Sequence, residues 1–171
     1  MSGASGASRL ASPTAFELAA GPRGATLVFA PRGAGRPALA SVALDVSGNR
    51  RGSVSPVLDR AVTSGEVTDV SAAFVDERLA AAWIERAHDA TRLRAAWVEP
   101  KARVFELGDA WRGPPTARGN VVVAARNGAG LVFARGGEVG CIEPGKHACY
   151  SFFFNELGRD GARRTGLPLS V

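Results

Sequence analysis

The chain has 171 residues, 46 % of them apolar, a formal net charge of +5, two cysteines and two histidines. This length and composition predict one globular core and exclude an intrinsically disordered chain. No apolar run approaches the roughly 18 residues of a membrane-spanning helix, and the start of the chain lacks the apolar segment of a secretory signal. We therefore expect a cytoplasmic or otherwise intracellular protein without membrane contacts, whose cysteines are free thiols. Arginine greatly outnumbers lysine, a bias typical of bacterial or viral genomes rich in G and C.

The first part of the chain is predicted to hold a tail and three strands. Residues 1–13 are rich in glycine, serine and alanine, which is typical of a flexible tail. A single globular domain is expected to follow over residues 14–171. Within it, short apolar runs separated by Gly, Pro and Ser clusters predict three strands, at Thr14–Leu18, Ala25–Ala30 and Ala38–Val46.

Two helices are expected next in the chain. Ser55 and Pro56 suit the N-cap and first position of a short helix, which Gly65 would end. A longer helix is predicted over about residues 71–90, because apolar residues recur there at the four-residue spacing of an amphipathic helix. That apolar stripe consists of Val75, Leu79, Trp83 and Ala87. The acidic residues expected on the solvated face of the same helix are Asp76, Glu77 and Glu85.

Residues 91–99 fit either a continuation of this helix or a strand. We favour a strand that turns at Pro100-Lys101 into a further strand at Arg103–Leu107. The segment Gly108–Gly119 contains Trp111 and two adjacent prolines, and it is predicted to be a loop.

The segment 120–154 is predicted to be a meander of four short apolar strands joined by three tight turns. The turn signals are Asn127-Gly128, Gly136-Gly137 and Pro144-Gly145-Lys146. The register that these turns imply pairs Val122 with Phe133, Leu131 with Ile142, and Cys141 with Cys149. Both faces of such a meander are apolar, so a second layer must cover it.

These elements together predict an α+β fold that is mostly antiparallel β. Its core would be a two-layer, β-sandwich-like structure with one main helix at about 71–90 and the C-terminal meander at about 120–154. Two internal similarities bear on this prediction, since Leu27-Val-Phe-Ala recurs from Leu131 and Phe16-Glu-Leu recurs from Phe105. We interpret them as two related β-layers, with chance similarity in a chain of restricted composition as the alternative.

A candidate metal site lies in the last hairpin of the predicted meander. The expected register places four potential ligands on one face, namely Cys141, Glu143, His147 and Cys149. Two thiolates, an imidazole and a carboxylate could bind zinc tetrahedrally. A cross-strand disulfide between the two cysteines, or two ordinary buried thiols, are the alternatives.

Two short segments resemble metal-binding loops of known families. Residues 137–147 resemble the second half-motif of cupins, in which a Pro-Gly turn precedes a metal-binding histidine, although the first cupin motif has no counterpart here. This resemblance implies a metal-binding β-sandwich for a small ligand. Residues 45–49 resemble the first metal-site loop of von Willebrand A domains, with Asn49 in place of the last serine. An ordinary polar turn is the alternative interpretation of that loop.

Arginines in the second half of the chain form a candidate surface for a nucleic acid or another polyanion. The candidate residues are Arg112, Arg118, Arg135, Arg159, Arg163 and Arg164. Guanidinium groups on loops can bind phosphates, and the positive net charge favours anionic partners.

The leading functional hypothesis is a non-enzymatic domain for protein–protein interaction or assembly, with a protein partner or self-association. His88 and Asp89 resemble a base with an orienting carboxylate, but no nucleophile can be placed beside them. An apolar sheet that needs covering favours interaction with a protein. The alternatives are a nucleic-acid-binding protein and the metal-binding, cupin-like protein described above.

Overall fold

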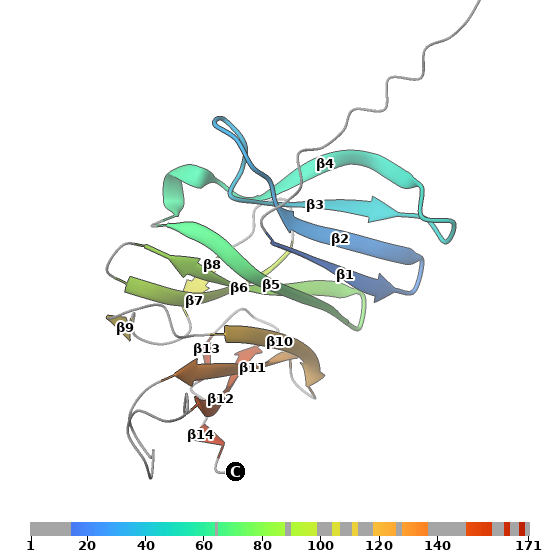
Figure 1. Ribbon diagram of the computed structural model, residues 1–171. Coiled ribbons are helices and arrows are strands. Elements are labelled where there is room, and N and C mark those ends of the chain that lie inside the picture. The colour runs from blue at the N-terminus through green and yellow to red at the C-terminus, as the bar shows by residue number, and fades with distance from the viewer. Residues whose placement is uncertain are drawn as a thin grey trace, which may run out of the picture.

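The computed structural model describes residues 15–63, 65–87, 90–98, 104–106, 111–112, 118–125, 128–136, 150–158, 163–164 and 168–169. These residues form antiparallel strands in three sheets and one short 3₁₀ helix, and none of them lies in an α-helix (Figure 1). The antiparallel β component of the predicted fold is confirmed. The helical component, and with it the α+β class, is wrong.

The first sheet has the strand order β1-β2-β3-β4, so each strand pairs with its neighbour in sequence. Its strands are β1 (Ala15–Gly21), β2 (Gly24–Ala30), β3 (Leu39–Leu44) and β4 (Arg50–Leu58). Exposure alternates along β1, where Phe16, Leu18 and Ala20 are exposed, and Gly21 pairs with Gly24 across the first hairpin. The three strands predicted in this region are therefore confirmed.

The second and third sheets repeat this order. The second sheet contains β5 (Glu66–Val75), β6 (Arg78–Arg86), β7 (Ala90–Trp97) and β8 (Val104–Glu106). A further short strand, β9 (Trp111–Arg112), also pairs with β7. The third sheet contains β10 (Arg118–Ala125), β11 (Gly128–Gly136), β12 (Tyr150–Gly158) and β13 (Arg163–Arg164), while β14 (Pro168–Leu169) also pairs with β12.

The main helix predicted at 71–90 is instead the hairpin of β5 and β6. Asp76 and Glu77 form its turn, where Asp76 adopts a φ of 57°, and Val75 pairs with Arg78. The four-residue spacing misled the prediction because four is also a multiple of the strand period of two. Leu79 and Trp83 therefore share one face of β6, and that strand is buried on both faces.

The short helix predicted from Ser55 to Gly65 is also wrong. Ser55 and Pro56 belong to β4, and a proline is tolerated there because β4 is an edge strand with an irregular register. Among the described residues of this segment, only Arg60–Val62 is helical. It forms a 3₁₀ turn that the carboxylate of Asp59 caps by accepting from the Ala61 amide at 3.0 Å.

The favoured strand at residues 91–99 is confirmed as β7, and the strand predicted at 103–107 is confirmed as β8. The loop predicted at Gly108–Gly119 is wrong in part, because β9 lies inside it. There, Trp111 pairs with Thr91 of β7.

Of the four strands predicted at about 120–154, the first, second and last correspond to the antiparallel strands β10, β11 and β12, but the predicted register and strand order are wrong, since β12 pairs directly with β11. Val122 pairs with Leu131 instead of Phe133, and Leu131 pairs with Asn155 of β12 instead of Ile142. Gly128 is the first residue of β11 and pairs with Ala125 and Gly158, so it is not a turn residue. A Cβ at this position would collide with the carbonyl oxygen of Leu157. Residues 137–149, which include the proposed Cys141–Cys149 pair, lie outside the described part of the chain.

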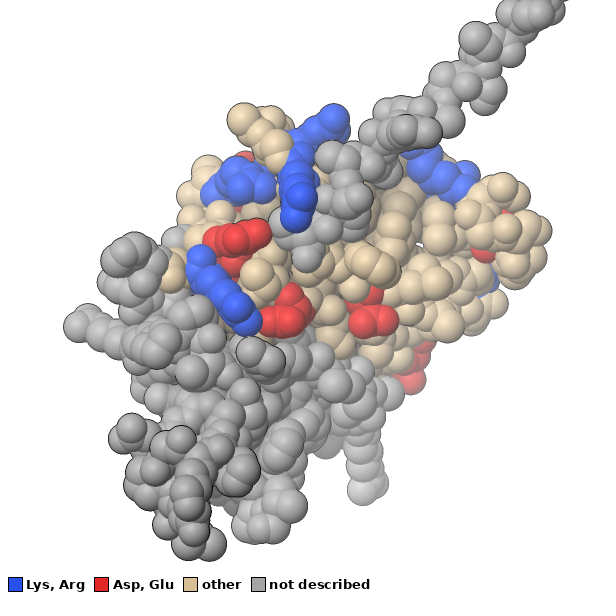
Figure 2. All heavy atoms as spheres, viewed as in Figure 1, with Lys and Arg blue, Asp and Glu red and all other residues tan. Residues whose placement is uncertain are grey.

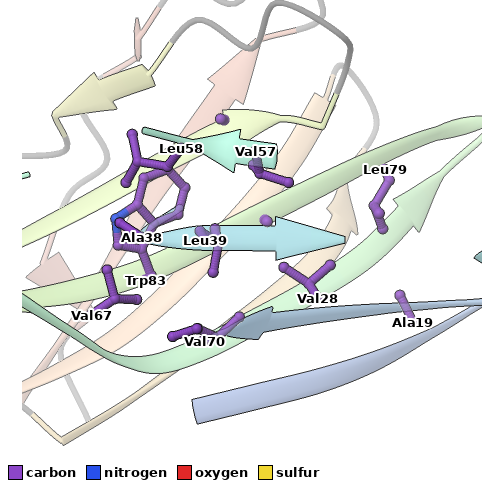
Figure 3. Packing of buried hydrophobic residues seen from close by; sticks show 13 residues of the cluster. Ala19, Val28, Ala38, Leu39, Val57, Leu58, Val67, Val70, Leu79 and Trp83 are labelled. Atoms are coloured by element: carbon purple, nitrogen blue, oxygen red, sulfur yellow. The ribbon is translucent and has the colours of Figure 1, made fainter. Parts of the chain in front are cut away.

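The three sheets stack face to face with the second sheet in the middle, so the core has three layers rather than the predicted two (Figure 1). Between the first and second sheets, Trp83 packs in one cluster with Ala38 and Leu58 (Figure 3). On the other side of the second sheet, Ile84 packs in one cluster with Ala129 and Leu157 of the third. The first strands of the sheets are neighbours, since β1 and β10 both pack beside β5.

The stack is an internal repeat. Leu27-Val-Phe-Ala in β2 and Leu131-Val-Phe-Ala in β11 each begin three residues after the glycine that opens the strand. At both glycines, Gly24 and Gly128, a Cβ would collide with a carbonyl oxygen of the third strand. The similarity of Phe16-Glu-Leu to Phe105-Glu-Leu joins a first strand, β1, to a fourth strand, β8, and is therefore not part of the repeat. Successive four-stranded meanders, stacked with their first strands together, resemble consecutive blades of a β-propeller.

Candidate interaction surface

The outer face of the first sheet, which is turned away from the second sheet, is apolar. Strand alternation assigns to it Phe16, Leu18, Leu27, Phe29, Ala40, Val42 and Leu44. Three of these, Phe29, Ala40 and Val42, form a buried cluster, and the leucines at 27 and 44 pack against it half-buried. Phe16 and Leu18 on β1 are 64 % and 53 % exposed. Because Leu18 pairs with the half-buried Leu27, these side chains are contiguous, and contiguous apolar patches rather than scattered residues mark interaction sites.

The corresponding face of the second sheet is covered. Counting back from the hairpin turn, Phe16 corresponds to Val70 and Leu18 corresponds to Ala72. Val70 is only 7 % exposed and packs, together with Ala72, in the cluster between the first and second sheets. The same backbone position is therefore enclosed in the second sheet and open in the first.

The equivalent face of the third sheet is also covered by a neighbouring sheet. Ala25 pairs with Leu44 in the first sheet, and Ala129 pairs with Leu157 at the equivalent place in the third. Ala129 and Leu157 are both fully buried in the cluster against the second sheet, whereas Ala25 and Leu44 are only half-buried. In two of the three sheets this face receives a neighbouring sheet.

A hollow of about 330 Å³ opens at the hairpin end of the seam between the first and second sheets. Its charged lining consists of Arg23, Arg51 and Glu77. The guanidinium of Arg23 lies 4.0 Å from the Glu77 carboxylate, with both side chains at least 80 % exposed, and Arg51 donates to the Arg23 carbonyl at 3.3 Å. Such solvated contacts contribute little stability, and the hollow contains no pairing of a nucleophile with a base.

A second hollow, of about 490 Å³, lies beside the connection between β2 and β3. Arg60 spans it and donates to the carbonyl oxygens of Arg36 at 3.3 Å and Pro31 at 3.4 Å. This guanidinium therefore holds the connection in place. Basic and acidic side chains are interspersed over the described part of the face seen in Figure 2, without one continuous basic patch.

A buried ionic cluster ties the second sheet to the 3₁₀ turn. Glu85 is fully buried and accepts from the Trp83 indole and from Arg94, both at 3.1 Å. Arg94 also donates to the Val62 carbonyl at 3.1 Å. The prediction that Glu85 is solvated is wrong, because β6 is the covered central strand of the stack. The sequence signal for a buried Glu85 was its position as a single carboxylate two residues after Trp83, at the end of an apolar run.

The loop that resembles a von Willebrand metal site is a turn between β3 and β4. The Asp45 carboxylate accepts from the backbone amides of Ser47 and Asn49, both at 2.9 Å. The Asn49 amide is the main reason that the pKa of Asp45 lies below its ordinary value of 3.8. The carboxylate thus serves the turn itself, in agreement with the ordinary-turn interpretation.

The other predicted site residues are only partly within the described structure. The proposed zinc ligands Cys141, Glu143, His147 and Cys149 lie outside it, and the residues that are described contain no group of three or more His, Cys, Asp or Glu able to hold a metal ion. Of the proposed polyanion-binding arginines, Arg159 lies outside as well. The others are strand residues, with Arg112 in β9, Arg118 in β10, Arg135 in β11, and Arg163 and Arg164 in β13. Zinc and polyanion binding stay predictions.

Comparison with known proteins adds no functional assignment. No protein-family model matches the chain, and no curated protein matches it. Within the described ranges there is also no helix with the length and apolar character needed to cross a membrane. The outer face of the first sheet is therefore the feature on which a functional proposal can be built.

Proposed function

We propose that this protein is a non-enzymatic module for protein binding and assembly, which acts through the outer face of its first sheet. One observation carries the proposal: Phe16 and Leu18 are exposed at positions whose equivalents in the second sheet are enclosed by a neighbouring sheet. The chain thus presents to solvent the β1 side of a face that it covers with a neighbouring sheet elsewhere, while Phe29, Ala40 and Val42 on that face are already buried.

The size of the apolar surface indicates what kind of partner could bind. Complete burial of a Phe or Leu side chain contributes about 1.5–3 kcal/mol. Association costs an estimated 4–15 kcal/mol in lost freedom, so burial of Phe16 and Leu18 alone would give at best weak binding. A useful partner must also cover the half-buried Leu27 and Leu44. These requirements fit a flat surface of the size of a sheet better than a small molecule or a short peptide.

Lateral strand pairing is a poorer alternative for the first sheet. β4 forms its outer edge, and most of that strand is exposed. The strand begins with two arginines, contains Pro56, and has irregular register against β3. Charges, proline and irregularity are features that prevent pairing at a sheet edge. Contact through the face of the sheet is therefore favoured over contact through its edge.

Site-specific photocrosslinking would test this function. A benzophenone amino acid replaces Phe16 in one variant and Val46 in a control, because Val46 is 91 % exposed but lies in the β3–β4 turn, outside the strands of the sheet. In a cell extract we expect crosslinked protein from position 16 and none from position 46. Excess unlabelled wild-type chain should compete for this product, and excess Leu18→Asp chain should not. Equal crosslinking at both positions, or none at position 16, would contradict the proposal.

A further inference from the structure

We propose that the partner on the outer face is a second copy of this chain, arranged head to tail, so that two copies close a ring of six sheets. This inference rests on the proposed function and specifies its partner. Each copy would place the outer face of its first sheet against the third sheet of the other copy.

The stacking within one chain already supplies the geometry for this contact. The second sheet presents one face to the first sheet and its opposite face to the third, so all the sheets are stacked in the same sense. The stack consequently ends in two different surfaces. One is the outer face of the first sheet, and the other is the far face of the third sheet. A head-to-tail contact between copies would repeat the arrangement that joins the first sheet to the second.

The far end of the stack has a matching apolar composition. In the third sheet, Val132 of β11 pairs with Val121 of β10 and with Phe154 of β12. These three residues therefore form one row across the sheet, at positions that alternate with Ala129 and Leu131. Ala129 itself belongs to the face covered by the second sheet. Because alternate positions of a strand belong to opposite faces, the row is assigned to the far face.

The number of sheets favours closure by two copies. Sheets that stack with their first strands adjacent form rings of typically four to eight members around those strands. The described residues supply three sheets, and two copies of them supply six, a number within that range. Head-to-tail contacts that fail to close produce open filaments. Two copies related by a two-fold axis would instead form two identical contacts and leave neither end of the stack exposed.

Light scattering on the purified chain would test the ring. At rising protein concentration we expect a limiting mass of two chains for the wild type. Phe16→Asp should reduce that mass to one chain, and the control Val46→Asp should leave it at two. Circular dichroism of both variants should retain the β signal of the wild type, so that a change in mass is not a change in fold. A wild type that stays at one chain, or that grows beyond two chains, would overturn the closed ring.

Crosslink mapping separates this inference from the proposed function. In the purified dimer, the crosslinker at position 16 should attach to peptides of β10–β12 from a differently isotope-labelled copy. Attachment to peptides of β1–β4 would indicate a face-to-face dimer and overturn the head-to-tail arrangement. If the purified chain is monomeric but position 16 still crosslinks competitively to another protein in extract, self-association is wrong and the protein-binding function stands. The absence of crosslinks in both settings would remove both proposals.

Discussion

The first and second sheets share a strand order and an orientation, but they differ in what covers them. The second sheet lies between two others, and its central strand β6 is buried from Leu79 to Glu85. The first sheet is packed against another sheet on one side only, although Phe29, Ala40 and Val42 at the centre of its other face are buried. Its edge strand β4 is exposed over most of its length. One backbone pattern therefore supports two patterns of exposure. Exposure alternates along β1, where Phe16, Leu18 and Ala20 on the outer face are exposed, whereas β6 is buried at every residue from Leu79 to Glu85.

The largest expected difference in stability between the two sheets comes from introducing a carboxylate at equivalent positions. Val70→Asp places a carboxylate in the cluster between the sheets, where Val70 is 7 % exposed. We expect a loss of roughly 4–5 kcal/mol in the free energy of unfolding, because the charge has no buried partner. Phe16→Asp changes the equivalent position in the open sheet, and it should alter stability by about 0.5 kcal/mol or less.

Urea unfolding of both variants at low protein concentration measures this difference. The low concentration matters because association through the outer face would add to the stability of the wild type. Similar losses in the free energy of unfolding for the two variants would show that Phe16 is covered within a single chain, which would contradict the difference between the two sheets.

The ionic cluster of the covered sheet should have the next largest effect. Glu85→Ala leaves the Arg94 guanidinium, which is 13 % exposed, without its 3.1 Å carboxylate. Removing one partner of a buried pair typically costs about 3–5 kcal/mol. Glu77→Ala, at the solvated rim of the same seam, is the matched control and should leave the urea midpoint unchanged. A small effect of Glu85→Ala would mean that water reaches this end of the seam.

Glycines that open the second strands should show a smaller difference. Gly24→Ala and Gly128→Ala would each push a methyl group into a third-strand carbonyl, and Gly24 also has a φ of +131°. We expect losses of about 1–3 kcal/mol. The second sheet has Arg78 at this position, with its guanidinium 4.3 Å from the centroid of the Trp97 ring, so Arg78→Ala should cost about 0.5–1 kcal/mol. Thermal denaturation would rank the three variants, and the reverse order would contradict the assigned repeat.

The smallest effect is expected from pH at the β3–β4 turn, which reports on the open sheet alone. The pKa of Asp45 is lowered in the folded protein, mainly by its hydrogen bond from the Asn49 amide. The ionised carboxylate therefore stabilises the fold above its ordinary pKa of 3.8, and this contribution is lost as pH falls through the lower folded value. Wild type should exceed Asp45→Asn in urea midpoint near neutral pH, and the difference should close in acid. A difference that is constant with pH would contradict this role.

Strands were predictable from the sequence where short apolar runs are bounded by Gly and Pro clusters, as in β1, β2 and β3. The strands that end at Gly21 and begin at Gly24 form the expected hairpin. β6 was not predictable in the same way, because covering on both faces removes the alternation and leaves apolar residues from Leu79 to Ile84. The register of β11 was missed because the glycine at 128 accommodates a neighbouring strand rather than a turn.

The candidate surface was only indirectly predictable. The sequence indicated an apolar sheet that requires covering, but strand patterns do not show which sheet lies at the end of a stack. Phe16 and Val70 both look like inward-facing strand residues, and only the order of the layers makes one exposed and the other buried. The recurrence of Leu27-Val-Phe-Ala was the available signal, because it marks equivalent positions in different sheets.

The pairing of each strand with its neighbour in sequence has a consequence for synthesis. In the described chain only β9 and β14 pair by passing over another strand, so contact order is low for a β protein and each meander can form soon after it leaves the ribosome. The inner face of the first sheet nevertheless stays bare until β5 and β6 emerge. A nascent chain halted near residue 60 would thus display apolar surface on both sides of one sheet, and this is the point at which chaperones would be most needed.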